Sequence, residues 1–114
     1  MNNKNKISVI MSVYNNESSV ARAIESLLSQ TFKNLEILIV DDASTDSTYQ
    51  ICKYFSSNNE NIKLFQNDAN IGLTKSLNFL ADKATGDFLA RQDGDDISSP
   101  NRLQSQITFM NNNK

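Results

Sequence analysis

The sequence has no histidine, one cysteine, one proline and three glycines among its 114 residues. Without histidine, any general base must be a carboxylate, and neither a Ser-His nor a Cys-His nucleophile can form. The single cysteine, Cys52, lies on the apolar face of an expected helix, which excludes a disulfide framework and a cysteine metal cluster. Glycines at positions 72, 86 and 94 cannot supply a dinucleotide-binding fingerprint or a Walker-type phosphate loop.

The chain also lacks an excess of positive charge and a long apolar run. Eleven basic and thirteen acidic residues give a formal net charge of −2, which provides no field for nucleic acid. The polar residues 1–6 are followed only by the short apolar run Ile7–Met11, too short for a signal peptide or a membrane span. We therefore expect a protein of the cytoplasm, either free or peripheral at the inner membrane face.

Apolar runs typical of strands alternate with helical patterns along the whole chain. Such alternation favours βαβ units and a parallel sheet. The sequence thus predicts a single α/β domain over residues 1–114, with a mainly parallel Rossmann-like sheet and flanking helices. The expected strands are 7–13, 35–40, 62–65 and 87–90, the last of them interpreted as a buried strand.

Candidate boundary residues accompany each of the helical patterns. Serine and threonine are favoured at helix N-caps, glycine just beyond the C-terminus and proline at the first helical position. The expected N-caps are Ser18 or Ser19 for the first helix, Ser44 or Thr45 for the second and Ser99-Pro100 for the fourth, while the third has Leu73 at the start of its apolar stripe and Gly86 as its C-terminal cap.

Three carboxylates stand within four positions directly after the last expected strand, at Asp93, Asp95 and Asp96. Like charges this close raise each other's pKa unless a cation offsets them. Oxygen ligands select hard ions, so Mg²⁺ or Mn²⁺ suits the site better than zinc and would also bind a substrate's diphosphate. Gly94 is expected to give the tight turn that lets Asp93 and Asp95 converge. The alternative is a solvated acidic turn, since an isolated Asp-x-Asp motif is common.

A second acidic pair, Asp41-Asp42, follows the second expected strand. Ligands of open α/β sheets bind at the carboxyl ends of the strands, although such a pair could also cap the next helix. Tyr14, after the first strand, would add an aromatic face for a base, or would be only a rim residue. Phosphates would be handled by the metal and by residues such as Arg91, Lys75 or Arg102.

Several motifs occur in a characteristic order with strand and helix spacers between them. They are Val9–Asn15, Ser26–Thr31, Val40–Asp46, Asn70–Leu73 and Gln92–Asp96, and Pro100-Asn101-Arg102-Leu103 extends the pattern. In this order the chain resembles the N-terminal half of family 2 glycosyltransferases of the GT-A fold, and the match covers nearly the whole chain. An ordered set is far more specific than any one short motif.

This resemblance implies inverting transfer of a sugar, of the hexosyl or N-acetylhexosaminyl class, from a nucleotide-diphospho-sugar to a hydroxyl of a saccharide acceptor. UDP is the expected nucleotide, Mn²⁺ or Mg²⁺ the expected ion, and cell-surface polysaccharide synthesis the expected process. By the same resemblance, Tyr14 and Asp42 would hold the base, Asp93 would lie near the ribose, Asp68 and Lys75 would line the nucleotide pocket, and Asp95 with Asp93 would bind the metal.

Family members continue into a second half that resembles an acceptor-binding region and supplies the Asp or Glu that acts as catalytic base. We therefore expect this chain to be truncated before the acceptor-binding half, with the catalytic base located beyond Lys114. No residue among the 114 can be assigned as that base. Residues 1–114 should then bind donor and metal with little or no transfer alone.

Two other hypotheses stay open. One is a receiver-type phosphoacceptor domain, although such a domain carries its acidic pair after the first strand, where this chain has Tyr14-Asn15. The other is a non-catalytic remnant, either a stable half-domain with no activity or one whose uncovered sheet edge pairs with another chain.

Overall fold

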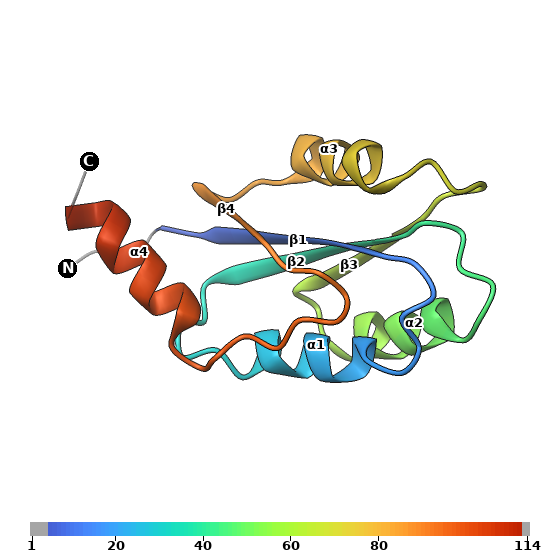
Figure 1. The fold of residues 1–114 in the computed structure, drawn as a ribbon. Helices are drawn as coiled ribbons and strands as arrows, with labels where there is room; N and C mark the ends of the chain where they lie inside the picture. Colours follow the sequence, from blue (N-terminus) through green and yellow to red (C-terminus); the bar gives the residue numbers. More distant parts are fainter. Residues whose placement is uncertain (1–4, 113–114) are drawn as a thin grey trace.

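The structure, a computed structural model, describes residues 5–112, in which strands and helices alternate along the chain. The strands pair in parallel in the order β3-β2-β1-β4, which confirms the predicted α/β class and parallel sheet (Figure 1). Each expected strand agrees with an observed one to within one residue at either end. The elements are β1 (Ile7–Val13), α1 (Val20–Leu28), β2 (Leu35–Asp41), α2 (Thr48–Asn58), β3 (Ile62–Gln66), α3 (Leu73–Lys83), β4 (Phe88–Arg91) and α4 (Arg102–Asn112).

The two central strands, β1 and β2, are buried on both faces because helices cover both sides of the sheet (Figure 1). Successive side chains of a strand point to opposite faces. Val9 and Met11 therefore pack with α1, α2 and α4, whereas Ile10 and Leu38 pack under α3. Cys52 lies at 0% exposure in the larger of these two clusters, as predicted.

The prediction that the last strand is buried is wrong. Within residues 5–112, β4 pairs with β1 alone and forms an edge of the sheet, and Leu89 on it is 49% exposed. Apolar sequence cannot distinguish an edge strand from a central one, because the order of strands depends on pairing between distant segments. The outer backbone groups of such an edge are open to further pairing.

The predicted N-cap of the second helix, Ser44 or Thr45, is also wrong. Helix α2 begins at Thr48 with Ser47 at the N-cap position. The reason is Asp46, whose carboxylate accepts hydrogen bonds from the Thr48 N–H (2.9 Å) and the Thr48 hydroxyl (2.5 Å). A side-chain acceptor at this point satisfies amide groups that a helix end leaves unpaired.

Helices α1 and α4 begin beside the acidic loop. Ser19 occupies the N-cap position of α1, as predicted, but its hydroxyl accepts no hydrogen bond from the helix N–H groups and instead donates to the Gly94 carbonyl (2.9 Å). The fourth helix begins at Arg102, not at Ser99-Pro100. Those residues form a turn instead, whose Ser99 carbonyl accepts from the Gln30 side chain at 2.6 Å.

Two predictions about α3 are wrong as well. Leu73 is 48% exposed and does not belong to the buried stripe. The helix ends at Lys83 with an extended Ala84 at the C-cap position, so Gly86 is not its cap. Gly86 instead allows a close approach, because a Cβ there would lie 2.7 Å from the backbone nitrogen of Ser8.

A buried carboxylate joins the sheet to the α3–β4 connection near the amino ends of β1 and β2. Glu36 accepts hydrogen bonds from the Ser8 hydroxyl (2.6 Å) and the Thr85 N–H (2.7 Å), and Lys6 lies 3.4 Å away. Burial by itself would raise the pKa of Glu36. The bonds from Ser8 and Thr85, with the charge of Lys6, outweigh burial and hold that pKa below its ordinary value of 4.5.

Because the folded pKa of Glu36 lies below its unfolded value, the ionised carboxylate stabilises the fold above about pH 4.5, and this contribution is lost as pH falls through the lowered pKa. Glu36→Gln should therefore reduce the free energy of unfolding by about 1–3 kcal/mol near neutral pH and make stability less sensitive to acid. Urea denaturation at stepped pH measures both effects.

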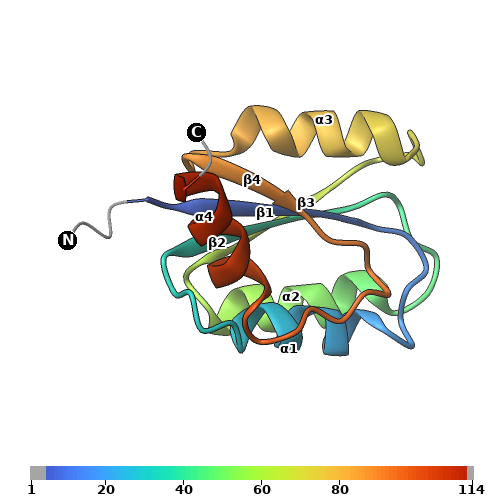
Figure 2. The same ribbon diagram turned by 60° about the vertical axis from the view of Figure 1, so that its left-hand side comes forward.

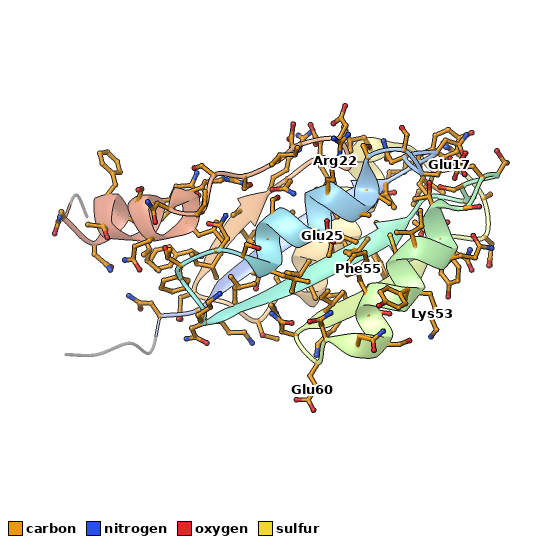
Figure 3. All side chains as sticks on the ribbon, turned by 90° about the horizontal axis from the view of Figure 1, so that it is seen from below. Glu17, Arg22, Glu25, Lys53, Phe55 and Glu60 are labelled. Atoms are coloured by element: carbon orange, nitrogen blue, oxygen red, sulfur yellow. The ribbon has the colours of Figure 1, made fainter. Side chains whose placement is uncertain are left out.

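The matched control is Glu60→Gln, since Glu60 is exposed and its side chain extends away from the fold (Figure 3). It should leave both the stability and its pH dependence unchanged. Equal losses in the two variants, or an unchanged acid response in Glu36→Gln, would contradict this account of Glu36.

Candidate functional site

The carboxyl ends of β1, β2 and β4 meet at one edge of the sheet. The three strands are parallel neighbours, with Val13 opposite Asp41 and Ile10 opposite Arg91. Their following loops surround a hollow of about 400 Å³, the place where open α/β sheets bind ligands. The lining residues are Ser12, Tyr14, Asn16, Asp42, Asn70, Gly72, Leu73, Asp93, Gly94 and Asp95.

Four of the predicted site residues, Tyr14, Asp42, Asp93 and Asp95, line this one hollow. They come from three different loops and are separated by up to 81 positions in sequence, so only the parallel sheet brings them together. Tyr14 is 46% exposed at the rim, which leaves its ring accessible to a planar ligand. Asp42 is 3% exposed and forms the inner wall.

The Asp42 carboxylate is held by donors from the β3–α3 connection. Oδ1 accepts from the Ile71 N–H (2.8 Å) and the Asn67 side chain (2.9 Å), and Oδ2 accepts from the Gly72 N–H (2.9 Å). Burial would raise the pKa of Asp42, but the hydrogen bonds from Ile71, Asn67, Gly72 and Ser76 outweigh it and keep the pKa below its ordinary value. An ionised carboxylate only accepts hydrogen bonds, so a ligand group that reaches Asp42 must be a donor.

The neighbouring Asp41 has a different role and is fully buried. Its carboxylate accepts from the Ser44 hydroxyl (2.5 Å) and the Ser44 N–H (3.2 Å), which ties the loop to the end of β2. The hypothesis that the pair caps α2 is thus wrong, because the Asp46 carboxylate accepts from the Thr48 N–H at the start of that helix.

Burial, and secondarily the charge of Asp41, raise the pKa of Cys52 to about 12, so this thiol stays neutral.

The segment Asn70–Leu73 forms a second wall of the hollow, a role that sequence reasoning missed. Gly72 has a φ of +93°, a conformation that side chains rarely adopt, and it stands at the N-cap position of α3. This geometry points its N–H at Asp42. A glycine directly before a helical pattern was the available signal, together with the Asn-Ile-Gly-Leu motif itself.

The acidic loop after β4 brings three carboxylates together. Oxygen atoms of Asp93, Asp95 and Asp96 lie within 4.8 Å of one another. The loop is closed by two hydrogen bonds of 3.1 Å, from the Asp93 N–H to Asp96 Oδ2 and from the Asp96 N–H to the Asp93 carbonyl. Arg91 donates to Asp93 Oδ1 through Nε and Nη2, each at 3.1 Å. One guanidinium against three carboxylates leaves two formal negative charges, which match a divalent cation.

The oxygen donors of this loop fit the ions expected from the sequence. Clustered carboxylates bind Mg²⁺ and Mn²⁺, and the three aspartates offer no soft ligand that would favour zinc.

Arg102, another residue predicted to handle phosphate, does not line the hollow. Arg102 donates to the Arg91 carbonyl (2.8 Å) and to the Ser98 hydroxyl (3.0 Å), so it braces the loop from outside the hollow.

Asp68 and Lys75 are exposed and are not among the residues that line the hollow. Asp68 lies in the β3–α3 connection that carries Gly72, and Lys75 lies in the first turn of α3. Their assignment to the nucleotide pocket stays a prediction.

The catalytic base is predicted to follow Lys114, and this prediction lies outside the described residues, which end at position 112. Within residues 5–112, the carboxylates that line the hollow are those of Asp42, Asp93 and Asp95, all three of which the sequence assigns to nucleotide or metal. The location of the base beyond Lys114 therefore stays a prediction.

Gly94 is required by close packing. The predicted tight turn is present, closed by the bond from the Asp96 N–H to the Asp93 carbonyl, but the φ of Gly94 is not in the left-handed region, so the turn itself does not require a glycine. A Cβ at this position would lie 2.6 Å from Asn16 Oδ1 and 3.1 Å from a methyl group of Val13. Asn16 Oδ1 in turn accepts from the Tyr14 N–H at 2.9 Å. Gly94 therefore lets the acidic loop approach the loop that carries Tyr14.

Comparison with known proteins identifies the class that this fold and hollow define. Residues 8–114 match the family model described as Glycosyl transferase family 2. The chain belongs to this family, which confirms the resemblance noted in the sequence. It is 50% identical over 111 residues to the Bacillus subtilis (strain 168) protein named "Putative glycosyltransferase EpsE", a match that covers 96% of this chain and 40% of EpsE.

Solved structures show the same fold with nucleotides bound. The structure of S. aureus TarS 1-349 in complex with UDP matches with a TM-score of 0.85 and 33% identity, covering 94% of this chain and 32% of the TarS 1-349 chain. The mannosyltransferase PcManGT from Pyrobaculum calidifontis, in complex with GDP-Man and Mn²⁺, matches with a TM-score of 0.73 and 25% identity, covering 78% of this chain and 27% of that one. The fold is of the GT-A type, and this chain spans less than half of each of these proteins.

Gly94→Ala should lower the free energy of unfolding by about 1–3 kcal/mol, because its Cβ would overlap Asn16 Oδ1. In an Asn16→Ala background the overlapping atom is absent, so the same substitution should cost clearly less. Urea denaturation of the four proteins of this double-mutant cycle measures the coupling. An equal cost of Gly94→Ala in both backgrounds would show that the contact with Asn16 is not what excludes a side chain.

Proposed function

We propose that this chain binds a nucleotide-diphospho-sugar together with Mn²⁺ or Mg²⁺, as the donor-binding part of an inverting glycosyltransferase. The observation that carries the proposal is the single hollow lined by Tyr14, Asp42, Asp93 and Asp95. An exposed ring, an ionised buried acceptor and a cluster of hard oxygen ligands around one space match the three parts of such a donor: base, ribose and diphosphate.

The base is assigned to the side of the hollow formed by Tyr14 and Asp42. The exposed Tyr14 ring can stack on a base, and such stacking is worth roughly 1–3 kcal/mol. Asp42 requires a donor, and the imide N–H of uracil is one. UDP is therefore the proposed nucleotide, a choice supported by the TarS complex, although PcManGT binds a guanosine nucleotide in the same fold.

The cation is assigned to Asp95 and Asp93, with Asp93 also near the ribose. The carboxylate cluster supports this proposal, as does the Mn²⁺ in the PcManGT structure. Such an ion supplies Lewis-acid neutralisation of the charge that develops on a departing diphosphate, worth several kcal/mol. The contribution of the chain is to hold its carboxylates within 4.8 Å of one another at the mouth of the hollow.

The lining of the hollow does not identify the acceptor or the transferred sugar. We propose a saccharide hydroxyl as the acceptor, a hexosyl or N-acetylhexosaminyl group as the transferred sugar, and cell-surface polysaccharide as the product. These proposals rest on the family, whose members are longer than this chain. Among the described residues, no helix is both long and apolar enough to cross a membrane. A cytoplasmic or peripheral location stays a prediction.

The receiver-type hypothesis is not favoured, because the whole described sheet matches glycosyltransferases and the acidic pair follows β2 rather than β1. Incubation with acetyl phosphate should leave no covalent phosphate on an aspartate. The remnant hypothesis concerns assembly, and the exposed edge strand β4 is the feature that it would use. Sizing across concentrations distinguishes a monomer from an assembly.

Calorimetry with UDP and Mn²⁺ tests the proposal. The chain should bind UDP more tightly with Mn²⁺ than without it, and Asp95→Asn should weaken the metal-dependent part by at least about 10-fold, because it removes a charged ligand. Asp42→Asn should weaken UDP binding both with and without metal, since an amide at this position no longer presents an acceptor-only group.

Asp82→Asn is the matched control, because Asp82 is an exposed residue of α3 that does not line the hollow. It should change neither affinity. Absence of binding by the folded wild-type chain, with UDP and with other nucleoside diphosphates, would overturn the proposed function. Equal effects of Asp95→Asn and Asp82→Asn would overturn the assignment of the metal.

We also expect little or no sugar transfer by residues 1–114 alone. The acidic side chains in the hollow are assigned to the base, the ribose and the cation, so none is left to deprotonate an acceptor hydroxyl, and the group that does so is proposed to follow Lys114. Release of UDP from UDP-sugars, measured in the presence of saccharide acceptors, should stay at the level of a protein-free control. Turnover comparable to that of a longer relative would contradict this expectation.

A further inference from the structure

We propose that Gln92 is a positioning residue that holds the carboxylates of Asp93, Asp95 and Asp96 in place for a cation. The inference rests on the proposed function and adds a residue to it. Gln92 does not line the hollow and touches no ligand space. It is 1% exposed and directly precedes the first of the three aspartates.

The side chain of Gln92 joins the acidic loop to α1. Nε2 donates to the Ala23 carbonyl of α1 at 2.9 Å and to the Asp96 carbonyl at 3.4 Å. Oε1 accepts from the Ser98 hydroxyl, and the Gln92 N–H donates to the Ile10 carbonyl of β1 at 3.1 Å. The buried side-chain amide thus connects the far end of the loop, at Asp96 and Ser98, with α1, while the backbone N–H of the same residue fixes the start of the loop to β1. Figure 2 shows the segment after β4 running beside α1.

The hydrogen bonds of Gln92 hold the loop at the place where its carboxylates repel one another. Three carboxylates within 4.8 Å repel one another, and Asp93 has 48% of its side chain exposed, so packing alone does not restrain it. Buried hydrogen bonds are strong in a low-dielectric surrounding, and partners behind metal ligands orient those ligands. Without the Gln92 bonds, the cation would have to order the loop as it binds, which lowers its affinity.

A second buried glutamine, Gln30, provides a matched comparison. It is 0% exposed, donates to the Ser99 carbonyl at 2.6 Å, and accepts from the Leu103 N–H at 3.0 Å. Gln30 therefore has similar burial and similar bonds but holds the start of α4, past the aspartates. Substitution of either glutamine should destabilise the fold, whereas only substitution of Gln92 should disturb the positions of the three carboxylates.

The test compares Gln92→Met with Gln30→Met in the whole chain, at a temperature where both are folded. Both variants should have a lower Tm than wild type. Gln92→Met should weaken Mn²⁺ binding in the presence of UDP by about 10-fold, while its affinity for UDP without metal stays within about twofold. Gln30→Met should keep both affinities within about twofold of wild type. Calorimetry measures the affinities and thermal denaturation the stability.

A second measurement does not depend on any ligand. The Asp93 and Asp96 amides are both hydrogen-bonded within the loop, so their hydrogen exchange reports its order. Nuclear magnetic resonance of the free proteins should show faster exchange at these amides in Gln92→Met, by about 10-fold, and little change in Gln30→Met.

The outcomes separate the two proposals. If wild type binds neither UDP nor Mn²⁺, the proposed function fails, and the exchange rates alone decide whether Gln92 orders the loop. If wild type binds both but the two variants weaken Mn²⁺ equally, or Gln92→Met weakens it by less than about twofold, Gln92 is only structural. Unchanged exchange at Asp93 and Asp96 in Gln92→Met would overturn the inference in either case.

Discussion

The parallel pairing of β1 with β2 on one side and β4 on the other is the constraint on which the site depends. β1 is buried on both faces and lies between β2 and β4, the two strands that are followed by the aspartates of the site. Because all three strands run the same way, Tyr14, Asp42 and Asp93 leave the sheet at one edge. An antiparallel β4 would carry Asp93 and Asp95 to the opposite edge, next to Glu36, and the hollow would lose its cation ligands.

The carboxylates of the molecule divide into those that the fold satisfies and those that it leaves in mutual repulsion. Glu36 and Asp42 are buried, accept several hydrogen bonds each and have lowered pKa values. They are ionised because the protein supplies donors. The carboxylates of Asp93, Asp95 and Asp96 face one another with few donors between them. The first kind holds loops to the sheet, and the second kind shares one guanidinium among three carboxylates, which is why carboxylates of one small fold have structural and ligand-binding roles.

Sequence patterns predicted the strands well because alternation and apolar runs are local properties. The same patterns failed where distant residues compete for a group. Ser44 does not cap α2, because its hydroxyl donates to the Asp41 carboxylate and accepts from the Asn15 N–H. Leu89 looked buried because nothing local reveals a sheet edge. The acidic site residues were recognisable from their position after strands. Gln92 and Gln30 lie within the ordered motifs, but their structural roles were not predicted, because a buried glutamine becomes interpretable only when its partners 69 to 73 positions away are known.

Arg91 illustrates why the acidic loop still favours an added cation although a positive side chain already stands there. Its ion pair with Asp93 spans 3.1 Å, but the two side chains are 51% and 48% exposed. Exposed pairs of this kind contribute about 0–1 kcal/mol, because water screens them and two long side chains lose freedom. Arg91 also contributes one charge against three. A divalent ion, by contrast, is a point charge that all three carboxylates can approach at once, so it relieves the repulsion that Arg91 only reduces.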